Sequence, residues 1–187
     1  MSDGLNTALI GSIFAGFAAE ARAARHHAPQ NTGATEQALT PEQGKIVWNA
    51  MMLATDALKR DLCRKYVGEG AASAMRKLWD SGRYTYFPGM QGGRIEDGRG
   101  PAWAETGPGP GFVSVFRLRT ALFYGFFNDE LINNPNRSGS AANLGITKEQ
   151  FWAETLLHEI RHYLCPGCKY AEKHDDWDTD IVKYCFK

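Results

Sequence analysis

The chain has 187 residues and no formal net charge at pH 7, and 43% of its residues are hydrophobic and 22% charged. These values are ordinary for a soluble globular protein and predict one domain over residues 1–187. The balanced charge argues against nucleic acid as a partner, because proteins that bind nucleic acid usually carry a basic excess.

Residues 1–28 are predicted to form an amphipathic helix, and residues 29–40, which are polar and contain Pro and Gly, a linker. A targeting or membrane-active segment is the alternative for the first stretch. However, it lacks the basic residues that open a signal peptide, and its apolar run is too short to give a stable membrane span. Its apolar residues recur every fourth position, which puts them on one helix face: Leu5, Leu9, Ile13 and Phe17.

The next helix is predicted to begin at Pro41 and to end near Gly68. Thr40 and Gln43 have the residue types and the spacing of a capping box, with a proline at the first helical position. A shorter helix is expected over residues 71–79. The apolar face of the longer helix is predicted to consist of Val47, Met51, Ala54, Leu58 and Leu62.

A small β-sheet is expected within residues 83–127. The predicted strands are residues 83–87 (RYTYF) and the alternating segment 112–119 (FVSVFRLR). Residues 88–111 are rich in Gly and Pro and are predicted to form one long loop. Residues 120–132 fit either a helix or a second strand.

The segment LLHEIRHYL, residues 156–164, carries the main functional signal. Thr147 and Gln150 predict a capping box that starts a helix through this segment. On a helix, residues four apart share a face, so His158 and His162 can direct ring nitrogens at one ion. An ordinary helix with surface histidines is the alternative, but the apolar neighbours indicate a buried helix, in which polar groups need partners.

The predicted chemistry is hydrolysis of peptide bonds in a protein or peptide substrate, with Zn²⁺ as the cofactor. Two neutral imidazoles leave the ion electrophilic, and the ion lowers the pKa of a bound water to about 7. Glu159, one residue after His158, can reach that water without being a ligand. It would accept the proton and pass it to the leaving amine.

The segment resembles the motif helix of the zincin metallopeptidases. The resemblance implies that His158 and His162 bind zinc, that Glu159 is the catalytic base and that an upstream strand, for which residues 112–119 are the candidate, docks the substrate. The longer metzincin pattern is absent, because YLCPGC follows His162. Too little chain remains for the downstream glutamate helix of thermolysin-like enzymes, so the aspartate-type zincins fit best.

The compact size is also similar to that of bacterial effector or toxin metallopeptidase domains. This resemblance implies a protein that is secreted or injected from a bacterium, and a cytoplasmic protein is the alternative. It further implies an immunity protein or a secretion-system component as a partner.

A short C-terminal helix is predicted, with Trp177, Ile181 and Tyr184 on its buried face. Asp178 lies at the edge of that face and is the predicted third zinc ligand. The alternatives are His174, Asp175, Asp176 and Asp180.

Three of the four cysteines lie near the C-terminus. A disulfide between Cys185 and the turn that contains Cys165 and Cys168 is favoured over free thiols and over a structural zinc site that includes His174. Cys63 is predicted to be a core residue of its helix.

The elements predict an α+β fold with a helical N-terminal portion, a small sheet, the motif helix and a short C-terminal helix. A zinc metallopeptidase is the favoured function. The alternative is a non-enzymatic, zinc-stabilised binding module that uses the C-terminal His/Cys cluster. Glu159 discriminates the two, because only the enzyme needs it.

Overall fold

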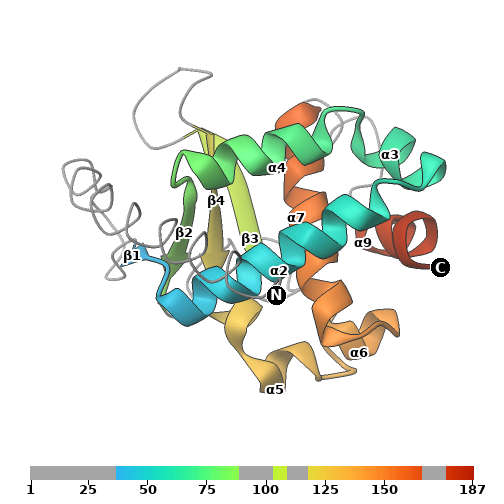
Figure 1. Ribbon diagram of the computed structural model, residues 1–187. Coiled ribbons are helices and arrows are strands. Elements are labelled where there is room, and N and C mark those ends of the chain that lie inside the picture. Colours follow the sequence, from blue (N-terminus) through green and yellow to red (C-terminus); the bar gives the residue numbers. More distant parts are fainter. Residues whose placement is uncertain (1–36, 89–102, 109–117, 166–175) are drawn as a thin grey trace, which may run out of the picture.

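The computed structural model describes residues 37–88, 103–108, 118–165 and 176–187. Within these ranges the fold is α+β, as the sequence predicts, with helices packed beside a small sheet (Figure 1). The predicted helix over residues 1–28 and most of the predicted linker lie outside the described residues.

The sheet has four strands in the order β1-β2-β4-β3. β2 (Tyr84–Phe87) and β4 (Leu118–Phe123) are parallel. β1 (Gln37–Ala38) pairs antiparallel with β2, and β3 (Ala104–Pro108) pairs antiparallel with β4. The small sheet predicted within residues 83–127 is therefore confirmed, and β1 adds a short edge from the predicted linker.

β3 shows that the prediction of one loop over residues 88–111 is wrong. Gly and Pro lower strand propensity, but β3 is an edge strand, where both are tolerated. Its pairing with β4 brings the hydroxyls of Thr106 and Thr120 within 3.0 Å of each other. The hydrogen bonds of β4 stabilise β3, and the local composition of β3 gives no sign of this pairing.

The segment around β4 divides differently from the prediction. Of the predicted strand 112–119, only residues 118 and 119 are described, and they begin β4. The undecided stretch 120–132 contains both kinds of structure. It completes β4, then forms a 3₁₀ helix (Tyr124–Phe127) and α5 (Asp129–Ile132).

The helix predicted from Pro41 to near Gly68 is two helices. α2 (Pro41–Ala57) begins at the predicted capping box, and α3 (Asp61–Val67) follows after a turn. Leu62, predicted on the apolar face, is 64% exposed, whereas Cys63 is fully buried. In a continuous helix Cys63 would lie about 140° around the axis from buried Leu58. The break lets both residues be buried.

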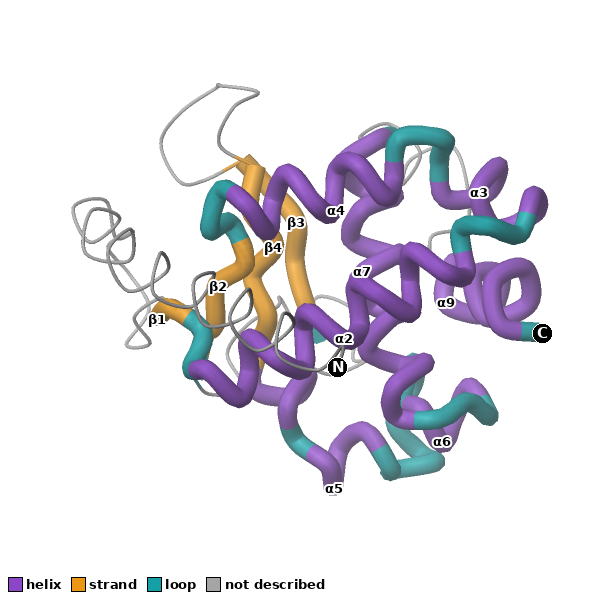
Figure 2. The backbone as a smooth tube through the Cα atoms, in the orientation of Figure 1, coloured by secondary structure: helices purple, strands orange, loops and turns teal. Residues whose placement is uncertain are grey.

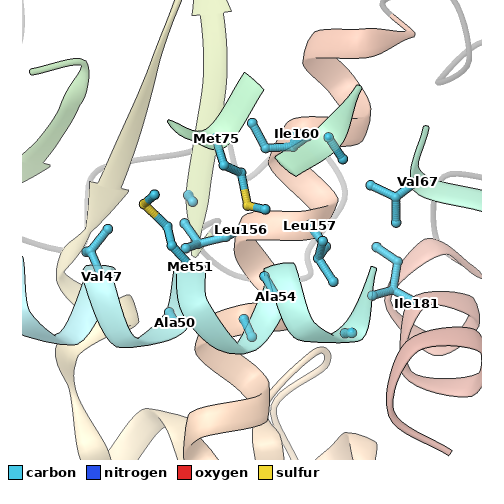
Figure 3. Close-up of a cluster of buried hydrophobic side chains, with 14 of the residues drawn as sticks. Val47, Ala50, Met51, Ala54, Val67, Met75, Leu156, Leu157, Ile160 and Ile181 are labelled. Carbon is cyan, nitrogen blue, oxygen red and sulfur yellow. The ribbon is translucent and has the colours of Figure 1, made fainter. Parts of the chain in front are cut away.

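α7 (Lys148–Leu164) runs through the middle of the molecule, with α2 and α4 (Ala71–Asp80) packed on it. Figure 2 shows the sheet at one end of these helices and α3 and α9 (Trp177–Ile181) at the other. The predicted short C-terminal helix is thus confirmed, and it continues into a π-helical segment, Val182–Phe186. Apolar side chains from α2, α4 and α7 meet in the core (Figure 3): Val47, Met51, Ala54, Met75, Leu156, Leu157 and Ile160.

Candidate functional site

The motif helix α7 begins as the sequence predicts. The Thr147 hydroxyl accepts from the backbone N–H of Gln150 at 3.2 Å, and the Gln150 side chain accepts from the backbone N–H of Thr147 at 3.0 Å. These bonds satisfy two backbone donors that a helix start leaves unpaired. HEIRH lies in the later turns of this helix, so the helical spacing required for a shared ion site is present.

His158 and His162 lie on one face of α7. Their Nε2 atoms are 3.1 Å apart. The indole of Trp177, from α9, lies against both rings, with centroid distances of 5.4 Å to His158 and 4.8 Å to His162. The His158 side chain is 13% exposed. The two predicted ligands therefore form a close, partly buried pair beside the Trp177 ring.

Asp178 lies on the other side of the His158 ring. Its Oδ1 is 2.6 Å from Nδ1 of His158, which is slightly shorter than the usual charge-assisted hydrogen bond between nitrogen and a carboxylate oxygen. Burial acts to lower the pKa of His158, but the hydrogen bond and charge of Asp178, with the charge of Glu159, outweigh it and raise this pKa. Sequence analysis placed Asp178 at the site, and the structure brings it to Nδ1.

Glu159 is buried, with 6% of its surface exposed. Its charge contributes to the raised pKa of both His158 and Glu154, so it lies close to the same cluster.

Glu154 is a site residue that sequence analysis missed. It lies one helical turn before His158 and is 2% exposed. Among the described residues, none forms a hydrogen bond with its Oε1 atom. Burial, and then the charge of Asp178, raise the pKa of this carboxyl well above its ordinary value. The sequence signal was its position four residues before His158, which puts it on the face of the histidine pair.

Glu154, His158 and Asp178 also form a group that could hold a cation. One potential ligand atom from each lies within 4.8 Å of the others. Among the alternative third ligands, His174 and Asp175 lie outside the described residues. Asp176 is exposed, and Asp180 accepts a hydrogen bond from the Tyr66 hydroxyl at 3.1 Å.

Arg161, inside the motif, stacks between two aromatic rings. Its guanidinium carbon lies 4.1 Å from the centroid of Tyr66 and 4.5 Å from that of Trp177, and its Nη1 donates to the Tyr66 carbonyl. A cleft of about 720 Å³ opens here, lined by Arg161, Trp177, Tyr66 and Asp180 among others. Trp177 therefore separates the histidine pair from an open hollow.

The cysteines pair differently from the prediction. Cys185 forms a disulfide with Cys63, with an S–S distance of 2.11 Å, and not with the turn after α7. Cys165 is disulfide-bonded too. The prediction failed because Cys63 and Cys185 are 122 residues apart and meet only when α3 packs on the C-terminal segment. Neither Cys165 nor Cys185 offers a thiolate to a metal.

Comparison with known protein families, with curated proteins and with solved structures finds no match to this chain. Among the described helices, none combines the length and the apolar character that crossing a bilayer requires.

Proposed function

We propose that the chain is a zinc-dependent metallopeptidase whose ion is bound by Nε2 of His158 and Nε2 of His162. The observation that carries the proposal is the 3.1 Å separation of these nitrogens on one face of α7. Two nitrogens bound to a tetrahedral zinc, each at about 2 Å, lie about 3.3 Å apart. A small opening of the pair therefore admits the ion.

The contact of Asp178 with His158 supports the same arrangement. A zinc-binding histidine usually donates its other ring N–H to a carboxylate, which fixes the ring and its tautomer. Asp178 lies 2.6 Å from Nδ1, opposite the nitrogen that approaches His162. We therefore assign Asp178 to orienting a ligand, in place of its sequence-predicted role as the third ligand.

The charge of the surroundings also fits a divalent cation. Glu154 and Glu159 are 2% and 6% exposed, and Asp178 interacts with Glu154 electrostatically. Carboxylates in a poorly hydrated place are costly unless a proton or a cation neutralises them. A cation at the histidine pair offsets part of that cost.

Zinc at this position supplies a water that ionises near neutral pH and a Lewis acid for a peptide carbonyl. Glu159 acts as the general base, which accepts a proton and passes it to the leaving amine. These are the roles that the zincin resemblance implies for His158, Glu159 and His162.

The disulfides support a protein that works outside a reducing cytoplasm. Cys63, Cys165 and Cys185 are all disulfide-bonded, and such bonds persist mainly in oxidising compartments. We therefore extend the proposal to a bacterial effector or toxin that is secreted or injected. A secretion-system component or an immunity protein would be its partner.

A second ligand set has an observation in its favour. Glu154, His158 and Asp178 could bind the ion instead, because one potential ligand atom from each lies within 4.8 Å of the others, and Nδ1 is the ring nitrogen of His158 that faces Asp178. The 2.6 Å between Nδ1 and Oδ1 is shorter than the roughly 3.3 Å between two ligands of a tetrahedral zinc. The Nε2 pair needs less rearrangement, so it is the preferred set.

The testing experiment combines metal content with cleavage. The full chain is purified without added metal, and its zinc is counted by plasma mass spectrometry beside His162→Ala. One zinc per parent chain, lost in His162→Ala, is expected, together with cleavage of an unstructured protein such as casein. Glu159→Gln should keep the zinc and lose the cleavage. A folded parent chain that takes up no zinc on addition contradicts the proposal. Equal cleavage by Glu159→Gln contradicts the role of Glu159 as the general base, whereas zinc binding without any cleavage by the parent chain favours a non-enzymatic zinc-binding protein.

A further inference from the structure

Gly139 lies against the carboxylate that orients His158. It is in the loop before α6 (Ala141–Leu144), with a φ of +70°. A Cβ atom added at Gly139 would lie 2.8 Å from Oδ2 of Asp178 and 3.1 Å from Nε1 of Trp103. Real Cβ contacts are almost never as short as the first distance, so a side chain here would force a neighbour to move.

Trp103 is packed against several other groups, so we do not expect it to move when a side chain is added at Gly139. The guanidinium of Arg137 lies 3.8 Å from its ring centroid, and the ring of Phe151 packs edge-on at 4.9 Å. On another side the backbone of Gly125 is so close that a Cβ there would lie 3.0 Å from the indole. Because protein interiors are close-packed, a ring confined in this way resists displacement.

The loop that carries Gly139 is also held in place. The backbone N–H of Gly139 donates to Oδ1 of Asn143 at 3.3 Å. The next residue, Ser140, donates from its hydroxyl to the Asn134 carbonyl at 2.6 Å and is fully buried. The loop therefore cannot easily retreat from the site, and the carboxylate of Asp178 is the group left to move.

We propose that Gly139 is a positioning residue of the metal site: its missing side chain leaves the space in which Asp178 reaches Nδ1 of His158. An alanine at this position pushes Oδ2 away and breaks or lengthens the 2.6 Å contact of Oδ1 with His158. The His158 ring then loses the partner that fixes its tautomer. The effect on zinc affinity rests on the proposed function, whereas the effect on the tautomer does not.

The simpler explanation of Gly139 is its backbone conformation, since a φ of +70° alone favours glycine. Gly145 provides a matched control. Its φ is +65°, and a Cβ added there would meet nothing within 4 Å. Gly139→Ala and Gly145→Ala therefore carry similar backbone strain, and only Gly139→Ala adds the contact with Asp178.

The experiment compares these two variants with the parent chain. Nitrogen-15 NMR of the metal-free protein reports which ring nitrogen of His158 carries the proton, with the signal assigned from His158→Gln. Zinc affinity is measured by competition with a chelating dye. Thermal unfolding monitors the shared backbone strain, which should lower the midpoint of both variants by about 2–8 °C.

At a pH high enough for the ring to be neutral, His158 in the parent chain and in Gly145→Ala should carry its proton on Nδ1. In Gly139→Ala the His158 ring should become a mixture of tautomers. Zinc affinity should fall about tenfold, as it does when a zinc-binding histidine loses the carboxylate that orients it. In an Asp178→Ala background, Gly139→Ala should cause no further loss of affinity, because the group that it displaces is gone.

An unchanged tautomer in Gly139→Ala overturns the inference, as does an equal change in both alanine variants. Full additivity with Asp178→Ala overturns it as well. If no variant binds zinc but the tautomer shifts only in Gly139→Ala, the positioning role stands and the proposed function fails.

Discussion

The imidazole of His158 and the carboxylate of Asp178 meet at 2.6 Å, although 20 residues separate them in the chain. The contact ties α9 to α7 at the centre of the candidate site. It occupies Nδ1 of His158, and Nε2 of the same ring approaches His162. One hydrogen bond thus sets which nitrogen is directed at the proposed ion.

Asp178→Asn should weaken zinc binding without removing the site. The amide keeps the shape of the side chain but loses the charge that favours the Nδ1–H tautomer, so zinc affinity should fall about 10–100-fold. The stoichiometry at saturating zinc should stay at one. Competition titration with a chelator measures the affinity. A loss as complete as that of His162→Ala would instead make Asp178 a direct ligand.

Glu154→Gln should separate the two possible ligand sets. If zinc binds the Nε2 pair, the Glu154 carboxylate is not a ligand, and affinity should change by only a few-fold. If zinc binds the set that contains Nδ1 of His158, loss of a charged ligand should lower the affinity far more. Competition titration with a chelator decides between the two ligand sets. Asp178→Asn is the reference, because it shows how far affinity falls when a residue that only orients a ligand is changed.

Glu154 should also make the metal-free protein less stable as the pH rises. Burial, and then Asp178, raise its pKa well above the ordinary 4.5, so the folded chain holds a proton that the unfolded chain releases. Stability is then full below about pH 4.5 and falls as the pH rises toward the folded pKa. The raised pKa of His158 acts in the same direction above its ordinary 6.5.

Urea unfolding of the metal-free protein between about pH 5 and pH 8 measures this effect. The free energy of unfolding of the parent chain should decrease across the range. Glu154→Gln should show a smaller decrease, because an amide does not titrate. Identical slopes for the two proteins would show that Glu154 does not hold the extra proton.

Removal of the Cys63–Cys185 disulfide should destabilise the fold strongly. The bond closes a loop of 122 residues, and the chain-entropy model gives about 5 kcal/mol for a loop of that size. The double variant Cys63→Ala/Cys185→Ala should unfold at a much lower urea concentration than the oxidised parent. The parent treated with a reductant should approach the variant, and a variant as stable as the oxidised parent would contradict the prediction.

Thr147→Ala should destabilise the protein by about 1 kcal/mol, because it removes the side-chain cap of α7. Thr179→Ala, at an exposed position within α9, is the control and should change the free energy of unfolding little. Urea unfolding of both variants provides the comparison. Equal effects would mean that the capping box contributes nothing measurable.

Local signals in the sequence were reliable where the structure depends on neighbouring residues. The capping boxes at Thr40 and Thr147 start α2 and α7 as predicted. The four-residue spacing of His158 and His162 placed both on one face of α7. These features follow from hydrogen bonds and side-chain directions within one or two helical turns, which a short stretch of sequence specifies fully.

Long-range pairings were not accessible in the same way. β3 forms in a stretch rich in Gly and Pro because β4 supplies its hydrogen bonds. The break between α2 and α3 was not predicted. It allows Cys63 to be buried, and the partner of Cys63 in its disulfide, Cys185, is 122 residues away in the sequence. Glu154 had the spacing of a site residue, but nothing local showed that its carboxyl is buried beside Asp178.

The sequence by itself determined the helix that carries the histidines, its starting point and the face they share, because helix geometry is local. It also brought Asp178 forward as a site residue through its place at the edge of a buried face. Only the tertiary structure decided that Asp178 meets Nδ1 of His158, that Gly139 leaves the space for it, and that Cys63 bonds Cys185. Each of these depends on how close elements distant in the sequence pack, and packing is a property of the whole fold.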